Sequence, residues 1–327
     1  MYVVTGGAGF IGSNIVAALE ERGDDVIVVD ALGSDDKWRN IAKRRLVDLL
    51  PPSSELDSVR GKVAGVIHMG AISSTTERDA DLIVENNFRY SRYLWDWCAQ
   101  NKVPFVYASS AATYGDGSLG FDDRDDSKHL AKLRPLNAYG WSKHLFDRWT
   151  CDRAKRGGAT PPHWAGLKFF NVFGPNEFHK GGQRSVALQI FEQVARGEPV
   201  KLFASDHPKY PDGGQLRDFV WVGDCVDIAL WFADGNRPSG LYNVGTGKAR
   251  SFVDLANAVF IAMNKPPEIE FVPMPGVLKG RYQYFTQAEM KKIKAAGYST
   301  EPTSLEEGVR HYVREYLAGG AGGLATR

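Results

Sequence analysis

The first half of the chain alternates short aliphatic runs with longer amphipathic segments. The runs predict strands at Tyr2–Thr5, Asp25–Asp30, Val63–His68, Pro104–Ser109 and Trp164–Asn171. The longer segments predict helices at Phe10–Glu21, Asp81–Asn101 and Asn137–Lys155. The strands are apolar over most of their length, as in sheets that are covered on both faces. This alternation predicts an α/β fold, a doubly wound parallel sheet with helices on both faces.

The pattern changes after Gly174-Pro175, where segments become shorter and Gly and Pro interrupt them. Phe219–Val222 and Leu241–Val244 predict strands that rejoin the main sheet, and Phe252–Ala262 and Thr286–Ala296 predict amphipathic helices. We therefore predict a large domain of residues 1–175 and 218–247, and a smaller, discontinuous α/β lobe of residues 176–217 and 248–317. The glycine-rich stretch 318–327 predicts a disordered tail.

Composition is that of a folded globular protein of about two domains. Of 327 residues, 43% are apolar and 24% are charged, which excludes disorder for the bulk of the chain. The net charge of +1 gives no general attraction to nucleic acid or anionic lipid. No apolar run approaches the ~18 residues of a membrane helix, and no secretion signal precedes the first strand. We expect neither a nucleic-acid nor a membrane partner.

The cysteines and histidines give no sign of a metal site. Cys98, Cys151 and Cys225 are odd in number and far apart, which excludes a disulfide framework and a thiolate zinc site. We expect three buried thiols in a protein of the reducing cytoplasm. The seven histidines show no metal-ligand spacing, so no metal is predicted.

A glycine-rich segment joins the first predicted strand to the first predicted helix. Gly6, Gly9 and Gly12 follow the pattern G-x-x-G-x-x-G, which brings backbone N–H groups close to a pyrophosphate at a helix N-terminus. Asp30 ends the second strand, where a carboxylate can hydrogen-bond a ribose hydroxyl. The large domain is therefore predicted to be a Rossmann-type dinucleotide-binding domain, and the smaller lobe to bind the substrate.

The residues that follow Asp30 affect the choice of cofactor. An acid at this position favours NAD, but Lys37 and Arg39 follow closely and could neutralise a 2′-phosphate, which favours NADP. The basic run continues with Lys43-Arg44-Arg45 and is equally compatible with a solvated helix face. We predict NADP, with NAD left open.

Two motifs further along the chain carry acid/base chemistry. Ser109-Ser110 closes the strand from Pro104, at the strand end where ligands bind in open α/β sheets. Tyr139 and Lys143 are four residues apart and share one face of a predicted helix. We expect the lysine cation to lower the pKa of the Tyr139 phenol. Such a tyrosine can exchange a proton with a hydroxyl while hydride moves to nicotinamide.

Together these residues resemble the extended short-chain dehydrogenase/reductase superfamily, which contains sugar-nucleotide epimerases and dehydratases. The resemblance extends to about Tyr316. Within it, several segments are similar to the family of ADP-L-glycero-D-manno-heptose 6-epimerases. They are His68–Glu77, Glu85–Asn87, Phe170–Pro175, His179–Gly181 and the most specific one, Lys279–Ala288.

The resemblance implies a role for each matching residue. Tyr139 and Lys180 would be acid/bases on opposite faces of one sugar carbon, with Lys143 and Ser110 assisting. The cofactor would contact Gly6, Gly9, Phe10, Ile11, Gly12, Asp30, Ala31, Lys37, Met69, Gly70, Ala71, Ile72, Ser73, Asn86, Lys143, Val172 and Lys180. The ADP-sugar would contact Asn171, Gly182, Gln189, Phe203, Ala204, Ser205, Asp206, Arg217 and Tyr282.

The implied activity is interconversion of ADP-D-glycero-D-manno-heptose and ADP-L-glycero-D-manno-heptose. It would proceed by transient oxidation at the 6″ carbon with a retained nicotinamide, and would serve lipopolysaccharide core heptose synthesis. The resemblance also implies a homo-oligomer, with a pentamer suggested. The sequence departs from the family pattern at Pro52, Met69, Gly182 and Gln189, and its loop His207–Leu216 is longer.

Other functions are compatible with parts of the sequence. A 4-epimerase or 4,6-dehydratase of the same superfamily shares the general motifs, but a dehydratase usually has an Asp-Glu pair where this chain has Thr113-Tyr114. A non-catalytic dinucleotide sensor tends to lose the Tyr/Lys pair that is kept here. By spacing alone, Lys180 would be a surface lysine after a turn. Arg217 could form a structural salt bridge with Asp218 or Asp224 instead of binding a diphosphate.

Overall fold

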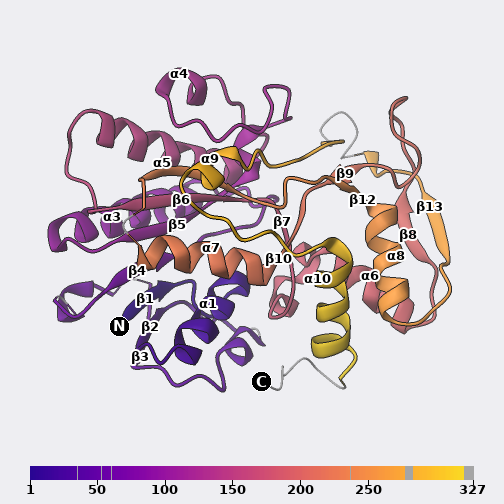
Figure 1. Cartoon of the computed structure of the whole chain (residues 1–327), viewed down its shortest axis with the longest axis horizontal. Coiled ribbons are helices and arrows are strands. Elements are labelled where there is room, and N and C mark those ends of the chain that lie inside the picture. The colour runs from indigo at the N-terminus through magenta and orange to yellow at the C-terminus, as the bar shows by residue number, and fades with distance from the viewer. Residues whose placement is uncertain (35, 53, 60, 236, 277–282, 320–327) are drawn as a thin grey trace.

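A parallel sheet organises the computed structural model, which describes residues 1–319 except 35, 53, 60, 236 and 277–282. Among these residues the sheet has seven strands in the order β11-β6-β5-β4-β1-β2-β3 (Figure 1). Their bounds are β1 Tyr2–Thr5, β2 Val26–Val29, β3 Asp48–Leu50, β4 Gly65–His68, β5 Phe105–Ser110, β6 Trp164–Phe169 and β11 Gly240–Val244. The predicted doubly wound α/β fold is confirmed.

Helices cover both faces of this sheet. Alternate strand residues point to opposite faces, and apolar side chains on each face pack against a layer of helices. Val4 lies in a core with α1 (Phe10–Glu21) and α7 (Val222–Asp234). Its neighbour Val3 lies in a second core, with α3 (Tyr90–Asn101) and α5 (Ala138–Lys155). The two cores explain why the strands are apolar at consecutive positions rather than at alternate ones.

The order of the strands places one crevice at the centre of the sheet. β1 lies between β2 and β4 in the sheet, so the chain turns one way after β1 and the other way after β3. Loops that follow β1 and β4 therefore diverge at the carboxyl edge of the strands. Ligands of doubly wound sheets bind at such a switch point.

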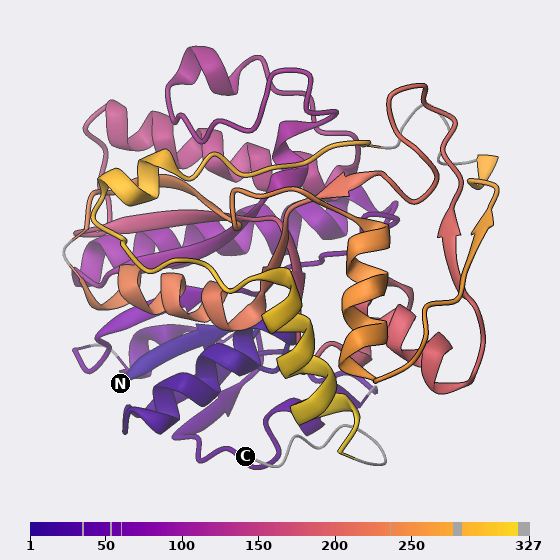
Figure 2. The same ribbon diagram turned by 45° about the vertical axis from the view of Figure 1, so that its right-hand side comes forward.

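A third core lies beside the sheet. It is formed by α6 (Val186–Ala195), α8 (Phe252–Ala262), α10 (Leu305–His311) and the parallel pair β8 (Val200–Phe203) and β13 (Ile269–Val272). Helix α8 stands to the right of the sheet, with β8 and β13 beyond it (Figures 1 and 2). The division into domains at the predicted boundaries stays a prediction.

Shorter elements complete the described chain. They are η1 Asp36–Asn40, η2 Leu56–Val59, α2 Ala80–Val84, η3 Glu85–Arg89, η4 Ala111–Tyr114, α4 Ser127–Leu130, β7 Asn171–Phe173, η5 Phe178–Gln183, β9 Leu216–Arg217, β10 Phe219–Trp221, β12 Arg250–Ser251, α9 Lys291–Ala295 and η7 Tyr312–Leu317. In the part of the chain that the structure describes, no helix has the length and apolar character needed to cross a membrane. Most of the predicted tail, residues 320–327, lies outside the described residues.

Two predicted elements are wrong. Phe219–Val222 does not rejoin the main sheet: β10 pairs with β7 in a separate two-stranded sheet, and the unpredicted helix α7 begins at Val222. The predicted helix Thr286–Ala296 is helical only over Lys291–Ala295. Its first part is not helical because Thr286 N–H donates to the Leu216 carbonyl (3.1 Å) and Ala288 N–H to the Asp218 carboxylate (2.9 Å).

Candidate functional site

The glycine segment packs against the chain that follows β4. Gly6 has a φ of 65°, and a Cβ there would lie 2.5 Å from the Gly70 nitrogen. A Cβ on Gly12 would lie 2.1 Å from the Gly6 carbonyl oxygen. No other residue type fits this close approach, so the glycines bring the loops after β1 and β4 into contact at the switch point.

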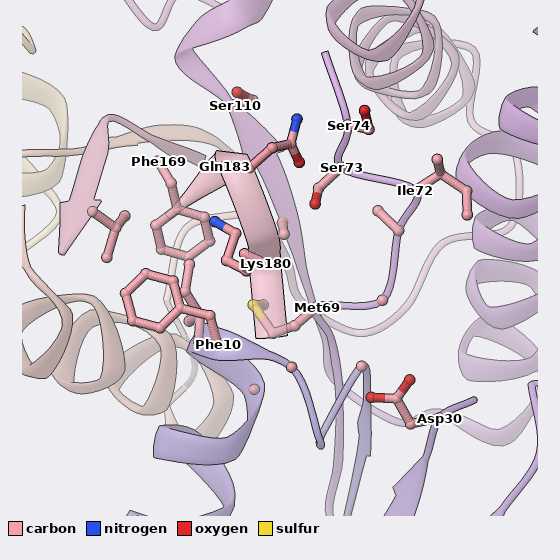
Figure 3. Close-up of a pocket in the computed structure, with 18 of the residues that line it drawn as sticks. Phe10, Asp30, Met69, Ile72, Ser73, Ser74, Ser110, Phe169, Lys180 and Gln183 are labelled. Carbon is pink, nitrogen blue, oxygen red and sulfur yellow. The ribbon is translucent and has the colours of Figure 1, made fainter. Parts of the chain in front are cut away.

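A cavity of about 600 Å³ opens at this contact. Its lining contains most of the residues predicted for the cofactor and the chemistry: Gly6, Gly9, Phe10, Ile11, Gly12, Asp30, Ala31, Lys37, Met69, Gly70, Ala71, Ile72, Ser73, Ser110, Tyr139, Lys143, Val172 and Lys180. Asp30 and Ser110 lie at opposite ends of the view in Figure 3. The cavity therefore joins the glycine loop to the predicted acid/base residues.

The start of α1 fits an anionic ligand. Gly9 is its N-cap and has no side chain to accept the first N–H groups. Phe10 and Ile11, in the first turn, line the cavity. Their N–H groups and the positive end of the helix dipole suit a pyrophosphate. The uncapped start of α1, with its first turn in the cavity lining, therefore fits the pyrophosphate of a dinucleotide, independently of the glycine motif.

Asp30 and Lys37 form an ion pair beside the glycine loop. The Lys37 ammonium lies 2.5 Å from one carboxylate oxygen of Asp30, and Ala8 N–H donates to the other at 2.9 Å. Two other cations of the basic run pair elsewhere: Arg39 with Asp36, and Arg44 with Glu20 at 3.1 Å. Within this run, Lys37 is therefore the cation that lines the cavity.

Tyr139 and Lys143 lie one turn apart on α5, whose N-terminus is capped by the Asn137 side chain. Lys143 is buried, and this burial lowers its pKa from 10.5 to about 8. Burial raises the pKa of Tyr139 above its ordinary 10.0, while the Ser110 side chain opposes the rise. The predicted lowering of the Tyr139 pKa by Lys143 is therefore wrong, because desolvation exceeds the other effects on the phenol.

Lys180 enters the cavity from η5 (Figure 3). Its ammonium lies 5.2 Å from the centre of the Phe10 ring. Burial lowers the pKa of Lys180, and the nearby Glu177 carboxylate raises it. Lys180 is half-buried and lines the cavity, so an ordinary surface lysine after a turn does not describe this residue, and its acid/base role stays a prediction.

Glu177 anchors the Lys180 segment to two other parts of the chain. Its buried carboxylate accepts hydrogen bonds from the Ser185 hydroxyl (2.6 Å) and the Tyr312 hydroxyl (3.0 Å). Its carbonyl accepts from the Lys180 N–H at 3.0 Å. The position of Lys180 therefore depends on the N-terminus of α6 and on the helical turn that follows α10.

Asn86 does not line the cavity. It donates to the Leu82 carbonyl within its own helix at 2.8 Å. The adjacent Asn87, which the sequence did not single out, bonds both backbone groups of Ile72 and the Ser142 hydroxyl. The π-helical turn Glu85–Arg89 sets which of the two points inward, and no sequence pattern announces such a turn.

The residues predicted to hold the ADP-sugar lie outside the lining of the cavity. They are Asn171, Gly182, Gln189, Phe203, Ala204, Ser205, Asp206 and Arg217, whereas Tyr282 lies outside the described residues. Further lining residues were not predicted: Leu32, Gly33, Ser74, Ala108, Ser109, Phe169, Phe170, His179 and Gln183. Most of these adjoin a predicted residue in sequence, which is the signal that could have found them.

Arg217 is buried, with its guanidinium 5.6 Å from the centre of the Phe252 ring. The two carboxylates considered as structural partners bind other groups. Asp218 accepts from the N–H groups of Thr246, Gly247 and Ala288, and Asp224 accepts from Thr303. The role of Arg217 toward a diphosphate stays a prediction.

The amino-acid sequence is similar to a known protein family and to several named relatives. The family model described as the NAD dependent epimerase/dehydratase family matches residues 2–245. The chain is 50% identical over 324 residues to an ADP-L-glycero-D-manno-heptose-6-epimerase of Nitratidesulfovibrio vulgaris, covering 97% of this chain and 98% of that one. It is 46% identical to the Fusobacterium nucleatum protein of the same name, with the same coverage.

Solved structures of sugar-nucleotide epimerases have a similar fold. The ADP-L-glycero-D-manno-heptose-6-epimerase of Helicobacter pylori has a TM-score of 0.78 at 25% identity, covering 95% of this chain and 94% of that one. The UDP-glucose 4-epimerase of Thermus thermophilus, in complex with NAD, has a TM-score of 0.76 at 28% identity, covering 98% and 99%. The chain therefore belongs to the NAD dependent epimerase/dehydratase family of extended short-chain dehydrogenase/reductases and, within it, to the ADP-L-glycero-D-manno-heptose-6-epimerases.

Proposed function

We propose that this chain interconverts ADP-D-glycero-D-manno-heptose and ADP-L-glycero-D-manno-heptose by transient oxidation at the 6″ carbon with a retained nicotinamide cofactor. One observation carries the proposal. A single cavity joins the glycine loop to Tyr139 on α5 and to Lys180 on η5. Inverting a carbinol carbon requires a proton donor and acceptor on each face, and this cavity offers two such residues from different elements.

A bound nicotinamide would accept a hydride from the carbinol carbon and later return it. Ser110 and Tyr139, which both line the cavity, would hold the hydroxyl of one epimer and move its proton. Lys143, one turn further along α5, lines the same cavity and would assist this transfer. Lys180 would perform the same proton transfer for the other epimer, and burial favours its neutral, proton-accepting form.

The alternatives fit the cavity less well. The two positions where a dehydratase would carry an Asp-Glu pair hold Thr113 and Tyr114, which are buried and bonded to Lys168 (2.8 Å) and Asn243 (2.6 Å). They therefore supply no free carboxylate. A non-catalytic sensor does not require Ser110, Tyr139 and Lys143 in one lining.

The finer assignments extend this proposal. Lys37 supports NADP over NAD, because its ammonium can neutralise a 2′-phosphate next to Asp30. We expect Lys37→Met to weaken NADP binding more than NAD binding in calorimetry, and tighter binding of NAD by the unmodified chain would contradict NADP. Similarity to the family supports Arg217 as a diphosphate anchor, a cytoplasmic homo-oligomer and a role in lipopolysaccharide heptose synthesis.

The direct experiment is incubation of the purified chain with each ADP-heptose epimer, followed by NMR of the sugar. The proposal predicts the same mixture of the two epimers from either starting compound. Conversion of a UDP-hexose at its 4 position, with no change in ADP-heptose, would indicate the 4-epimerase alternative. Absence of turnover with bound cofactor would favour the sensor.

A further inference from the structure

A buried ion pair lies directly behind the residues that line the cavity. The Lys168 ammonium is 2.6 Å from the Asp147 carboxylate, and the two side chains are 1% and 0% exposed. The pair joins β6 to α5. Neither residue lines the cavity, so neither touches a ligand bound there.

The pair holds Ser110 from both sides. On one side, the Ser109 hydroxyl donates to Asp147 at 2.7 Å, and the Tyr107 hydroxyl donates to the same carboxylate at 3.0 Å. On the other side, Lys168 donates to the Thr113 hydroxyl at 2.8 Å, which in turn donates to the Ser110 carbonyl at 2.8 Å. Ser110 therefore lies between two segments that are each bonded to the ion pair.

The pair also fixes the helix that carries the other acid/base residues. Asp147 follows Lys143 by four residues and Tyr139 by eight, so the three lie along one face of α5. Because Asp147 bonds β5 through two hydroxyls and β6 through Lys168, this face has one register against the sheet. The distance between Tyr139 and Ser110 depends on that register.

Stability alone does not explain the pair. Burying two charges costs about as much as their attraction returns, and apolar residues of similar volume are often as stabilising. A fully bonded polar network does, however, specify one arrangement of its elements. The bonds here run to the segments that position the cavity residues.

We propose that Asp147 and Lys168 are positioning residues, which hold Ser110 in register with Tyr139 and Lys143 and act on the reaction through them. This rests on the proposed function, since it is the proton transfer by Tyr139 that the pair would support.

The charge of Asp147 also acts on the catalytic face. It raises the pKa of Lys143 and of Tyr139, so it keeps the lysine cationic and the phenol neutral. The titratable groups packed around Asp147 are Tyr107 from β5, Tyr114 from η4, Lys168 from β6, and Tyr139, Lys143, His144 and Cys151 from α5. Burial lowers the pKa of His68 on β4, and the Lys143 cation lowers it further.

The test compares four variants with the unmodified chain: Asp147→Asn, Lys168→Met, the double variant Asp147→Asn/Lys168→Met, and Lys168→Arg. Asp224→Asn is the matched control, since Asp224 is a partly buried carboxylate on α7 that bonds Thr303 outside the cavity lining. Thermal unfolding identifies the variants that fold. For those, kcat and KM for epimerisation are measured against pH.

We expect Asp147→Asn to lower kcat by roughly 10- to 100-fold with KM nearly unchanged, because a small misplacement of reacting groups has that effect. The alkaline limb of the pH profile of kcat for this variant should move to lower pH by roughly one unit, because an opposite charge near Lys143 is lost. The double variant should fold and show the same loss in kcat. Lys168→Arg keeps the positive charge, so it should be far more active than Lys168→Met. A folded Asp147→Asn with unchanged kcat and pH profile, or a loss matched by Asp224→Asn, would overturn the proposal.

A second readout does not depend on the proposed reaction. NMR of ¹³Cε-labelled lysine, with the Lys143 signal assigned by its absence in Lys143→Met, follows the titration of that ammonium directly. The inference predicts a lower pKa for Lys143 in Asp147→Asn than in the unmodified chain. An unchanged titration would contradict it even if epimerisation were normal, whereas a shifted titration without any epimerisation would count against the proposed function alone.

Discussion

The two sides of the cavity are built in different ways. Tyr139 and Lys143 lie on an eighteen-residue helix that packs on the central sheet, and a buried ion pair fixes this helix to two strands. Lys180 lies in a six-residue 3-10 segment that is broken at Gly181, where φ is 54°. One buried carboxylate, Glu177, joins this segment to α6 and to Tyr312.

The two proposed acid/base residues are therefore held differently, Tyr139 firmly and Lys180 by few contacts. The helix side is held by many contacts, so the loss of a reacting group there should change activity without changing the fold. The η5 side depends on few contacts, so the loss of a remote partner should change the position of Lys180. The following predictions test the comparison from the largest expected effect to the smallest.

The largest effect is expected from Tyr139→Phe. Removing the hydroxyl removes the proton transfer on one face, so epimerisation should fall by roughly 10³-fold. The melting temperature should stay within a few degrees, because α5 keeps its packing. Activity assays and thermal unfolding of the same preparation check both parts. A large loss of stability would show that the helix side is less rigidly held than its contacts indicate.

Gly6→Ala and Gly182→Ala compare the backbone constraint in the glycine loop with that in η5. A side chain at φ 65° costs roughly 1–2 kcal/mol, and the added Cβ would also meet the Gly70 backbone at 2.5 Å. The free energy of unfolding and the affinity for the dinucleotide should both fall. Gly182→Ala on η5 is the control, since a Cβ there meets nothing within 4 Å. Urea unfolding and calorimetry should show losses for the first variant only.

Glu177→Gln should affect the η5 side alone. The amide cannot accept all the hydrogen bonds of the buried carboxylate, which costs about 1–3 kcal/mol of unfolding free energy. The negative charge that raises the pKa of Lys180 is also lost, so that pKa should fall. The pH profile of epimerisation should shift while binding of the dinucleotide stays the same. Equal losses of both would mean that η5 is not a separate support.

The smallest effect concerns pH and the stability of the helix side. Burial lowers the pKa of His144 on α5 from 6.5 to about 4, so the folded state holds it neutral where the unfolded state binds a proton. Its contribution to stability is therefore present above pH 6.5 and lost as pH falls toward 4. Urea unfolding between pH 7 and 4 should show a shallower loss for His144→Gln. An identical slope would contradict the burial of this ring.

The sequence predicted the elements with a regular apolar pattern better than the short segments around them. β1, α1, β2 and α8 agree closely with their predicted bounds, because their apolar periodicity coincides with buried faces. The glycines and the Tyr139/Lys143 spacing depend on local geometry alone, so they were also predictable. The Tyr139 pKa was not, since its main determinant is burial by residues distant in sequence.

The features that the sequence did not reveal depend on contacts and turns that only the fold defines. Thr286–Ala288 has an amphipathic pattern but is not helical, because Asp218 and Leu216 bind its backbone. Asn87 rather than Asn86 faces Ile72 because of a π-helical turn. The Asp147–Lys168 pair unites residues that lie 21 apart in sequence, and only the fold brings them together.

The central claim is that the reaction needs an acid/base residue on each side of the cavity, and Lys180→Met tests it most directly. Lys291→Met is the control, because that side chain is 92% exposed. Each variant is incubated with either ADP-heptose epimer and followed by NMR, after calorimetry has shown that the dinucleotide binds normally. We predict that Lys180→Met interconverts neither epimer, whereas the control is fully active. Full activity of Lys180→Met in both directions would contradict the claim.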